Sequence, residues 1–434
     1  MLLKDPKLKF SETLSIGSLT RFISGLQKES GDIPWHIEGK TDPWDIVETI
    51  MGLNIGKCFD ESYRAFEWMK RMQNPDGSWY SSYINGIPGD RTCETHMAAY
   101  ISVGLFHTWL MNKDTVFLNK MWPTMKKGIN YAIGLQAKGG EIYWAKSPEG
   151  NVDPMSLLAG SSSIFMSLKC ALAIAGILGK RKISWEHSFD KLGKSIRENT
   201  HNYNVSKSRF SMYWFYPILS GALTGKKANN RIEKYWNKYV IDGQGVRCVS
   251  DEPWVTIAET SELVIALHGM GRIEIANIVF SWIQDKVYKD STFWCGYTYP
   301  DIVIWPEEKI SWTNAVVLLA ADAIYSFTPA SGLFFPQFMG WIYLYGSCQL
   351  IKDYRPYYIK KAWYRLQHLY VRHKLSPQLT SLGKHSFIVK PWHIEIFGSP
   401  VSIGDNVTLL GCSDKKTRLT VWSDKKNIKG ITIG

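Results

Sequence analysis

Cysteine is scarce in this sequence, and its spacing excludes two classes of small stabilised domain. The seven cysteines stand at positions 58, 93, 170, 248, 295, 348 and 412, with no C-x-x-C pair. Neither a disulfide framework nor a zinc ribbon fits that spacing. The N-terminal segment MLLKDPKLKF also lacks the continuous apolar run of a secretory signal, so a cytoplasmic location is expected.

Several catalytic motifs are missing as well. The sequence has no G-x-S-x-G elbow, P-loop or H-E-x-x-H motif, and it contains no Asp-Asp dipeptide. Asp90, Cys93 and His96 follow one another at intervals of three, a spacing that spreads them around a helix by more than one turn. We therefore expect no metal site and no cofactor.

The charge is unevenly placed. The net charge of the chain is +12, and residues 329–434 hold 15 Lys and Arg against 5 Asp and Glu, which leaves the preceding part nearly neutral. No nucleic-acid partner is expected for that part, whereas the basic tail suits an anionic surface.

Two kinds of helical pattern alternate along residues 13–328. One kind has charges on a single face, as in helices on the outside of a domain. The other kind is richer in Ala, Ser, Thr and Gly, as in helices that pack closely around an axis. The expected outer helices span residues 14–27, 59–72, 116–135, 186–199, 229–240 and 273–285, and the expected inner helices span 44–53, 91–110, 156–176, 211–223, 255–269 and 311–326.

This alternation predicts an all-α fold, an (α/α)6 toroid of six helical hairpins over residues 1–328. The loops that enter the inner helices are long and hold many Trp, Tyr, Asp and Glu residues, whereas the loops that leave them are short and rich in glycine. Long loops gathered at one end of a compact domain are usually functional. We expect the active site at that end.

The tail has a different character. Residues 329–375 join an uncharged aromatic stretch to a basic helical pattern, which predicts a packed linker or peripheral membrane contact through residues 332–374, with a transmembrane span as a third alternative. Residues 376–434 contain P-V-S-I-G-D-N-V and end in G-I-T-I-G, which resembles the hexapeptide repeats of left-handed β-helix acyltransferases. The resemblance implies an incomplete β-helix.

Residues 1–328 resemble two families of proteins that are built on α/α toroids. Residues 73–79, Q-N-P-D-G-S-W, match the QW motif of terpenoid cyclases and protein prenyltransferases, and 136–144 and 284–294 are looser matches. In those families the motif ties the end of an outer helix to the next loop. Residues 94–135 are similar to the second hairpin of six-hairpin glycosidases. Classical prenyl chemistry requires aspartate-rich motifs that this sequence lacks.

Glycoside cleavage requires two carboxyl groups, one that protonates the leaving oxygen and one that activates water. Glu141 lies in G-G-E-I-Y-W beside two aromatic residues, so we expect it to be the general acid, with Glu259 or Glu307 as the base. Glu259 interrupts an apolar helix, where a buried carboxylate is paired or functional. The expected substrate-binding residues are Trp35, His36, Trp44, Asp45, Asp90, Arg91, Glu94, Trp144, Arg247, Asp251, Trp254 and Trp312.

The sequence thus favours an enzyme that acts on a glycan or glycoside, with a saccharide as its small-molecule partner. Two alternatives remain at this point. One is a prenyltransferase-like or terpenoid-cyclase-like protein that handles an isoprenoid. The other is a non-catalytic toroid that binds a glycan or a lipid.

Overall fold

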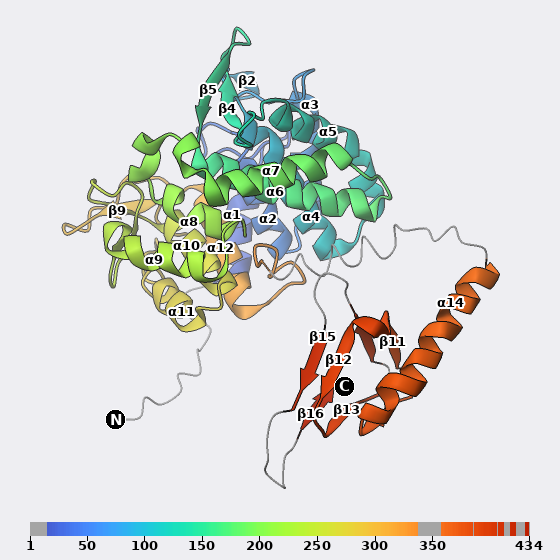
Figure 1. The fold of residues 1–434 in the computed structure, drawn as a ribbon. Coiled ribbons are helices and arrows are strands. Elements are labelled where there is room, and N and C mark those ends of the chain that lie inside the picture. The colour runs from blue at the N-terminus through green and yellow to red at the C-terminus, as the bar shows by residue number, and fades with distance from the viewer. Residues whose placement is uncertain are drawn as a thin grey trace, which may run out of the picture. The chain divides into compact units, whose positions relative to one another are not determined.

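The computed structural model describes residues 15–336, 357–384, 386–405, 407–411, 417–421 and 430–433. The chain divides after residue 350 into two compact units. The first unit is mainly helical, and the second combines one helix with short strands (Figure 1).

Twelve α-helices lie within residues 15–336, and their bounds agree with the expected spans within a few residues. The outer helices are α1 Ile16–Gly25, α3 Phe59–Met72, α5 Thr115–Gly134, α7 Ile183–Glu198, α9 Gly225–Tyr239 and α11 Ile273–Ser281. The inner helices are α2 Asp45–Ile55, α4 Thr95–Asn112, α6 Leu158–Ile177, α8 Ser211–Leu219, α10 Ile257–Gly269 and α12 Ser311–Tyr325.

The inner helices form a closed ring. Each of them contacts the next in the order α2, α4, α6, α8, α10 and α12, and α12 contacts α2 again. Small residues permit this approach: a Cβ on Gly52 would lie 2.7 Å from the Cβ of Ala315 on α12. Although α6 is long and apolar enough to cross a membrane, 89% of its most apolar stretch is buried inside the protein.

The outer helices pack against the ring with one face only, as amphipathic helices do. In α3 the buried residues include Ala65, Phe66 and Met69, and the acidic first turn and basic last turn suit the helix dipole. Such helices gain most of their stability from the apolar face that the ring covers.

The loops at the end where the inner helices begin, here called the rim, contain short strands that the sequence did not predict. One sheet has the order β3-β4-β5, and another has the order β6-β7-β8-β9. The bounds are β1 Tyr83–Ile84, β2 Ile87–Pro88, β3 Cys93–Glu94, β4 Tyr143–Lys146, β5 Val152–Ser156, β6 Val240–Ile241, β7 Gly245–Arg247, β8 Trp254–Thr256 and β9 Gly296–Thr298.

A repeated contact, here called the glutamine–glycine clamp, anchors three rim loops. The Gln73 amide donates to the carbonyls of Gly77, at 3.0 Å, and Thr124 on α5, at 2.9 Å. Gly77 has a φ of 99°, and a Cβ there would lie 2.4 Å from the Lys127 carbonyl oxygen. The same arrangement joins Gln27 to Gly31 and Glu61, and Gln136 to Gly140 and Ser188. In the QW segment the clamp therefore ties the end of α3 to the following loop.

The second unit is built from parallel strand pairs beside a helix (Figure 1). Strand β13 lies between β10 and β16, while β11 pairs with β14 and β12 with β15. A small core of Val371, Leu375, Ile394, Val401 and Ile403 holds the unit together. The bounds are α14 Tyr357–Tyr370, β10 Ser381–Leu382, β11 Phe387–Val389, β12 Ile394–Phe397, β13 Val401–Ile403, β14 Thr408–Leu410, β15 Thr417–Thr420 and β16 Ile431–Ile433. Most of the predicted aromatic stretch, residues 337–350, lies outside the described residues.

Candidate active site

The start of α2 is fixed by Asp42. One oxygen of its carboxylate accepts the backbone N–H groups of Trp44, at 3.0 Å, and Asp45, at 2.8 Å, as a helix cap does. The other oxygen accepts the indole N–H of Trp35 at 3.0 Å. These contacts hold Asp42 at the N-terminus of the helix, where an ionised carboxylate is favoured.

Asp45 follows in the first turn of α2 and is buried. Burial raises the pKa of Asp45 well above its ordinary value, and the adjacent negative charge of Asp42 raises it further. Asp45 therefore holds a proton more readily than a solvated aspartate does. A protonated carboxyl of this kind can act as a general acid.

Two further buried carboxyls are each held by a tyrosine. The Tyr100 hydroxyl on α4 donates to Glu48, and the Tyr216 hydroxyl on α8 donates to Glu262. Burial raises the pKa of Glu48 to about 7 and that of Glu262 well above its ordinary value. The Trp44 ring stacks on Tyr100, with centroids 4.4 Å apart, so aromatic rings line this part of the ring interior.

Glu259 lies in the first turn of α10, one helical turn before Glu262. Its carboxylate accepts a hydrogen bond from the Cys248 thiol, with Sγ 3.2 Å from Oε1. Burial raises the pKa of Cys295 to about 12, and the charges of Glu259 and, more weakly, Asp45 contribute to the increase. The Trp44 ring, next to the start of α2, lies with its centroid 6.0 Å from that of Tyr216, which bonds to Glu262 on α10. The starts of α2 and α10 therefore border one region.

An acid–histidine pair, Glu94 and His96, borders this region. Glu94 accepts a hydrogen bond from Ser81 at 2.9 Å, and its other oxygen lies 3.4 Å from His96 Nε2. The His96 ring meets the Trp44 ring edge-on, with centroids 5.0 Å apart. The Nδ1 atom of His96 is buried without a hydrogen-bond partner among the described residues.

Aromatic and charged side chains from the first and last rim loops continue the site outwards. Trp35 and Trp312 lie with their ring centroids 6.3 Å apart, and His36 Nε2 lies 3.6 Å from Glu308. The ammonium of Lys40 sits 4.2 Å from the Trp35 ring. Both indole rings are half-buried. Accessible ring faces beside ionisable groups are typical of carbohydrate sites.

The structure therefore brings together only some of the predicted site residues. Trp35, His36, Trp44, Asp45, Glu94, Glu259 and Trp312 belong to the region just described. Trp144 lies next to it on β4, where the Trp144 carbonyl accepts a hydrogen bond from Thr95 at the start of α4.

The other predicted residues lie elsewhere. Glu141 accepts a hydrogen bond from Asn202 at 2.7 Å, beyond the end of the outer helix α7, and Glu307 is exposed. Asp251 is exposed and pairs with Arg209, and the Trp254 indole donates to the Trp305 carbonyl. Asp90 and Arg91 are exposed in the loop before β3, and Arg247 lies on β7. The carboxyl assigned as the acid thus faces the outer layer.

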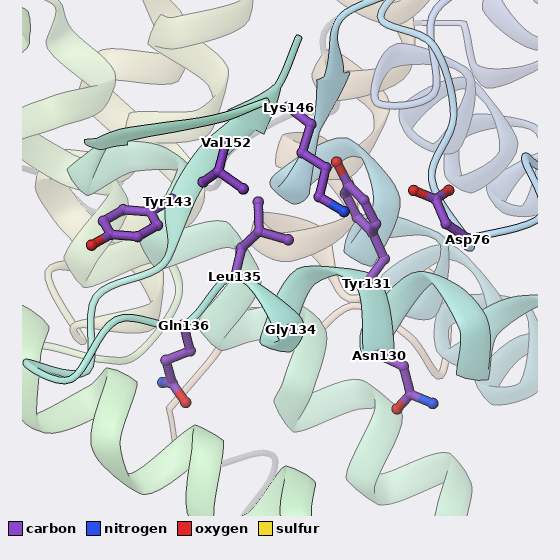
Figure 2. A pocket seen from close by; sticks show the side chains of 9 residues that line it. All are labelled: Asp76, Asn130, Tyr131, Gly134, Leu135, Gln136, Tyr143, Lys146 and Val152. Carbon is purple, nitrogen blue, oxygen red and sulfur yellow. The ribbon is translucent and has the colours of Figure 1, made fainter. Parts of the chain in front are cut away.

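A surface cavity of about 620 Å³ lies near this outer layer. Figure 2 shows the Lys146 side chain of β4 beside the Tyr131 ring, which comes from the last turn of α5. Leu135 and Tyr143 also line the cavity. Gln136 of the third clamp lines it too. None of the acidic residues around Trp44 does, so this cavity is separate from the site.

Asp42, Glu48, His96, Tyr100, Tyr216, Glu262 and Cys248 are site residues that the sequence did not select. The sequence shows that Glu48 and Glu262 are acids within expected inner helices. It does not show their tyrosine partners, because these come from other helices. Among the described residues, no group of three or more His, Cys, Asp and Glu side chains is arranged to hold a metal ion.

Known glycosidases are similar to this chain in sequence. The chain is 41% identical over 312 residues to the MMP endo-(1,4)-3-O-methyl-alpha-D-mannosidase of Mycolicibacterium hassiacum, an alignment that covers 72% of this chain and 86% of that protein. The chain belongs to the family of this mannosidase. A stretch of 121 residues is 33% identical to an uncharacterized glycosyl hydrolase of Methanocaldococcus jannaschii, covering 27% of this chain and 19% of that protein. No family model matches the chain.

Solved structures share the helical fold of this mannosidase-family chain. A GH63 mannosylglycerate hydrolase from Thermus thermophilus in complex with glucose matches 70% of this chain and 99% of its own, with a TM-score of 0.56 at 9% identity. A D-mannose isomerase matches 72% of this chain and 96% of its own, also with a TM-score of 0.56 at 9% identity. At such low identity these likenesses establish the fold alone.

Proposed function

We propose that the protein is a glycoside hydrolase that cleaves α-mannosidic bonds, with Asp45 as general acid and Glu259 as general base. The observation that carries this proposal is the placement of a protonated carboxyl and a second carboxylate at the starts of α2 and α10. The family supports the substrate class, because the relative from Mycolicibacterium hassiacum is named as a mannosidase.

In this mechanism Asp45 gives its proton to the glycosidic oxygen as the bond to the anomeric carbon breaks. Burial and the charge of Asp42 keep that proton in place until the leaving oxygen takes it. Glu259 removes a proton from the attacking water, and Cys248 holds its carboxylate in position. Glu48 and Glu262, deeper in the ring, would accept hydrogen bonds from sugar hydroxyls.

The aromatic residues supply the binding surface. The faces of sugar rings stack on indole rings while their hydroxyls meet charged groups. Trp35 and Trp312 stand near His36 and Glu308, a combination that suits a sugar unit on one side of the scissile bond. The alternatives drawn from the sequence, an isoprenoid enzyme or a binding protein, have no comparable support from the relatives.

We also interpret the closed ring as an (α/α)6 toroid of six hairpins. The order of helix contacts and the packing of each outer helix against the ring support this interpretation. For the second unit we propose turns of a left-handed hexapeptide β-helix. Its three sets of parallel strands, each set paired only within itself, support that proposal.

The test is hydrolysis of α-1,4-linked mannose oligosaccharides, with and without 3-O-methyl groups, by variants of the full chain. We expect Asp45→Asn and Glu259→Gln each to lower kcat at least about a hundredfold, in the range that acid–base groups contribute. Glu141→Gln and Glu307→Gln are matched controls that should keep wild-type turnover. Normal turnover in Asp45→Asn, or its loss in Glu141→Gln, would overturn the assignment.

A further inference from the structure

Helix α14 and the turn that follows it, Val371–Leu375, have one face packed on the second unit. Gln367, Val371 and Leu375 are buried there, and the Gln367 side chain accepts the backbone N–H of Lys390 at 2.8 Å. These contacts fix the rotation of the helix about its own axis. They also determine which residues point away from the unit.

The opposite face combines apolar and basic side chains. At 100° per residue, Leu369 lies opposite the packed face, with Leu366 on one side of it and Arg365 and Arg372 on the other. The two leucines are 55% and 53% exposed, and both arginines are exposed. Exposed leucines in a row along a helix are costly in water unless another surface covers them.

The charged residues of the segment that contains this helix have one sign. No Asp or Glu stands between Asp353 and Glu395, while Lys and Arg recur throughout that stretch. Exposed Lys374 adds to the two arginines near the C-terminal end of the helix. An occupant of this face therefore carries negative charge and offers an apolar layer to the leucines.

We propose that α14 binds flat on an anionic lipid surface. Leu366 and Leu369 enter the boundary between headgroups and acyl chains, and Arg365 and Arg372 contact the lipid phosphates. The leucines protrude from a convex helix and are flanked by arginines, the arrangement found in interfacial helices. An acidic protein groove is the other conceivable occupant, and vesicle binding separates the two.

The experiment is vesicle flotation of the full chain at low ionic strength. We expect the wild type to float with vesicles of phosphatidylcholine and phosphatidylglycerol and to remain below with phosphatidylcholine alone. The variant R365Q/R372Q should bind about 30-fold more weakly, given the usual contribution of a basic residue at an anionic surface. The variant L366S/L369S should bind the anionic vesicles at least about tenfold more weakly than the wild type.

Two double variants of the first unit serve as matched controls. Ile273 and Ile278 on α11 are 46% and 53% exposed, and Lys226 and Lys227 on α9 are exposed. I273S/I278S and K226Q/K227Q should float like the wild type. Thermal unfolding of each variant shows whether it is folded.

The proposal is overturned if the wild type fails to float with anionic vesicles, as a protein partner would require. It is equally overturned if phosphatidylcholine alone suffices, or if both α14 variants float like the wild type. Hydrolysis of mannosides is measured separately on soluble substrate. Failure of the membrane proposal thus leaves the catalytic proposal untouched, and the reverse also holds.

Discussion

The thiol of Cys248 donates a hydrogen bond to the carboxylate of Glu259, with Sγ 3.2 Å from Oε1. Strand pairing positions the thiol, because the backbone N–H of Cys248 donates to the Trp254 carbonyl at 3.1 Å, next to the β7–β8 ladder. Burial raises the pKa of Cys248, and the charge of Glu259 raises it further. The thiol therefore stays protonated and serves as a donor rather than a nucleophile.

Substitution of Cys248 tests this positioning role. Cys248→Ala removes the donor, and we expect kcat on the mannosidic substrate to fall about two- to tenfold with KM little changed, the range for one hydrogen bond. Cys248→Ser keeps a donor and should retain more activity. Equal losses in the two variants, measured by steady-state kinetics, would show that volume matters rather than hydrogen bonding.

Glu48 makes stability depend on pH. Its pKa is about 7 in the folded protein against an ordinary 4.5, because burial disfavours the charged form. The folded state therefore holds a proton that the unfolded chain releases, and stability falls as the pH rises from 4.5 through 7. The variant Glu48→Gln does not lose stability in this way, because an amide does not titrate. Its free energy of unfolding relative to wild type should rise by up to about 3 kcal/mol between pH 4.5 and 8.

Chemical denaturation at several pH values measures that difference. The exposed Glu38→Gln is the control, and its difference from wild type should not change with pH over the same window. A difference for Glu48→Gln that is flat with pH would mean that Glu48 has the same pKa in the folded protein as in the unfolded chain.

Lys169 on α6 predicts a pH dependence of the opposite sign. Its side chain is buried, and burial lowers the pKa from 10.5 to about 8. The cost of burying the ammonium is fully present below pH 8 and disappears as the pH rises to 10.5. The free energy of unfolding of Lys169→Met should therefore exceed that of wild type by about 3 kcal/mol at pH 7, and the difference should vanish by pH 10.5. The exposed Lys226→Met is the control, and thermal unfolding is the measurement.

The glutamine–glycine clamp predicts a contrast between two glycines. Gly77→Ala places a methyl group 2.4 Å from the Lys127 carbonyl oxygen at a φ of 99°, so both a clash and backbone strain oppose it. Gly86→Ala has a φ of 75° with nothing within 4 Å, so strain alone opposes it. We expect a loss of about 1 kcal/mol for Gly86→Ala and at least about 3 kcal/mol for Gly77→Ala. Similar losses in urea unfolding would show that the contact with α5 relaxes easily.

The helices could be predicted from the sequence. In each outer helix apolar residues recur every 3.6 residues, and each inner helix is rich in small residues. The clamp was recognised at Gln73 and Gln136, where Gly and Trp follow, and was missed at Gln27. There Gly-Asp-Ile-Pro-Trp replaces Gly-Ser-Trp, although the hydrogen bonds are the same. Gln284, the third proposed match, is followed by no glycine at that spacing.

The site was harder to predict. Asp45, Trp44 and Glu259 stand in or next to the first turns of inner helices, a position that periodicity can identify. Glu141 was selected for its neighbours in sequence, but the turn at Gly139 and Gly140 directs its carboxylate to Asn202, which is 61 residues away. Hydrogen bonds such as Tyr100–Glu48 join separate helices, and no local pattern marks them.

The clamps fix where three rim loops start and leave the rest of each loop unconstrained by them. The glutamine of each clamp is hydrogen-bonded to the neighbouring outer helix. An insertion farther along the loop therefore does not disturb the packing of that helix against the ring. These loops can therefore differ in length beyond the clamps while the ring of inner helices keeps its packing. For protein engineers, the turn between β1 and β2, at Asn85 and Gly86, is a place to lengthen the loop after Gly77 without removing Ser81 or Glu94.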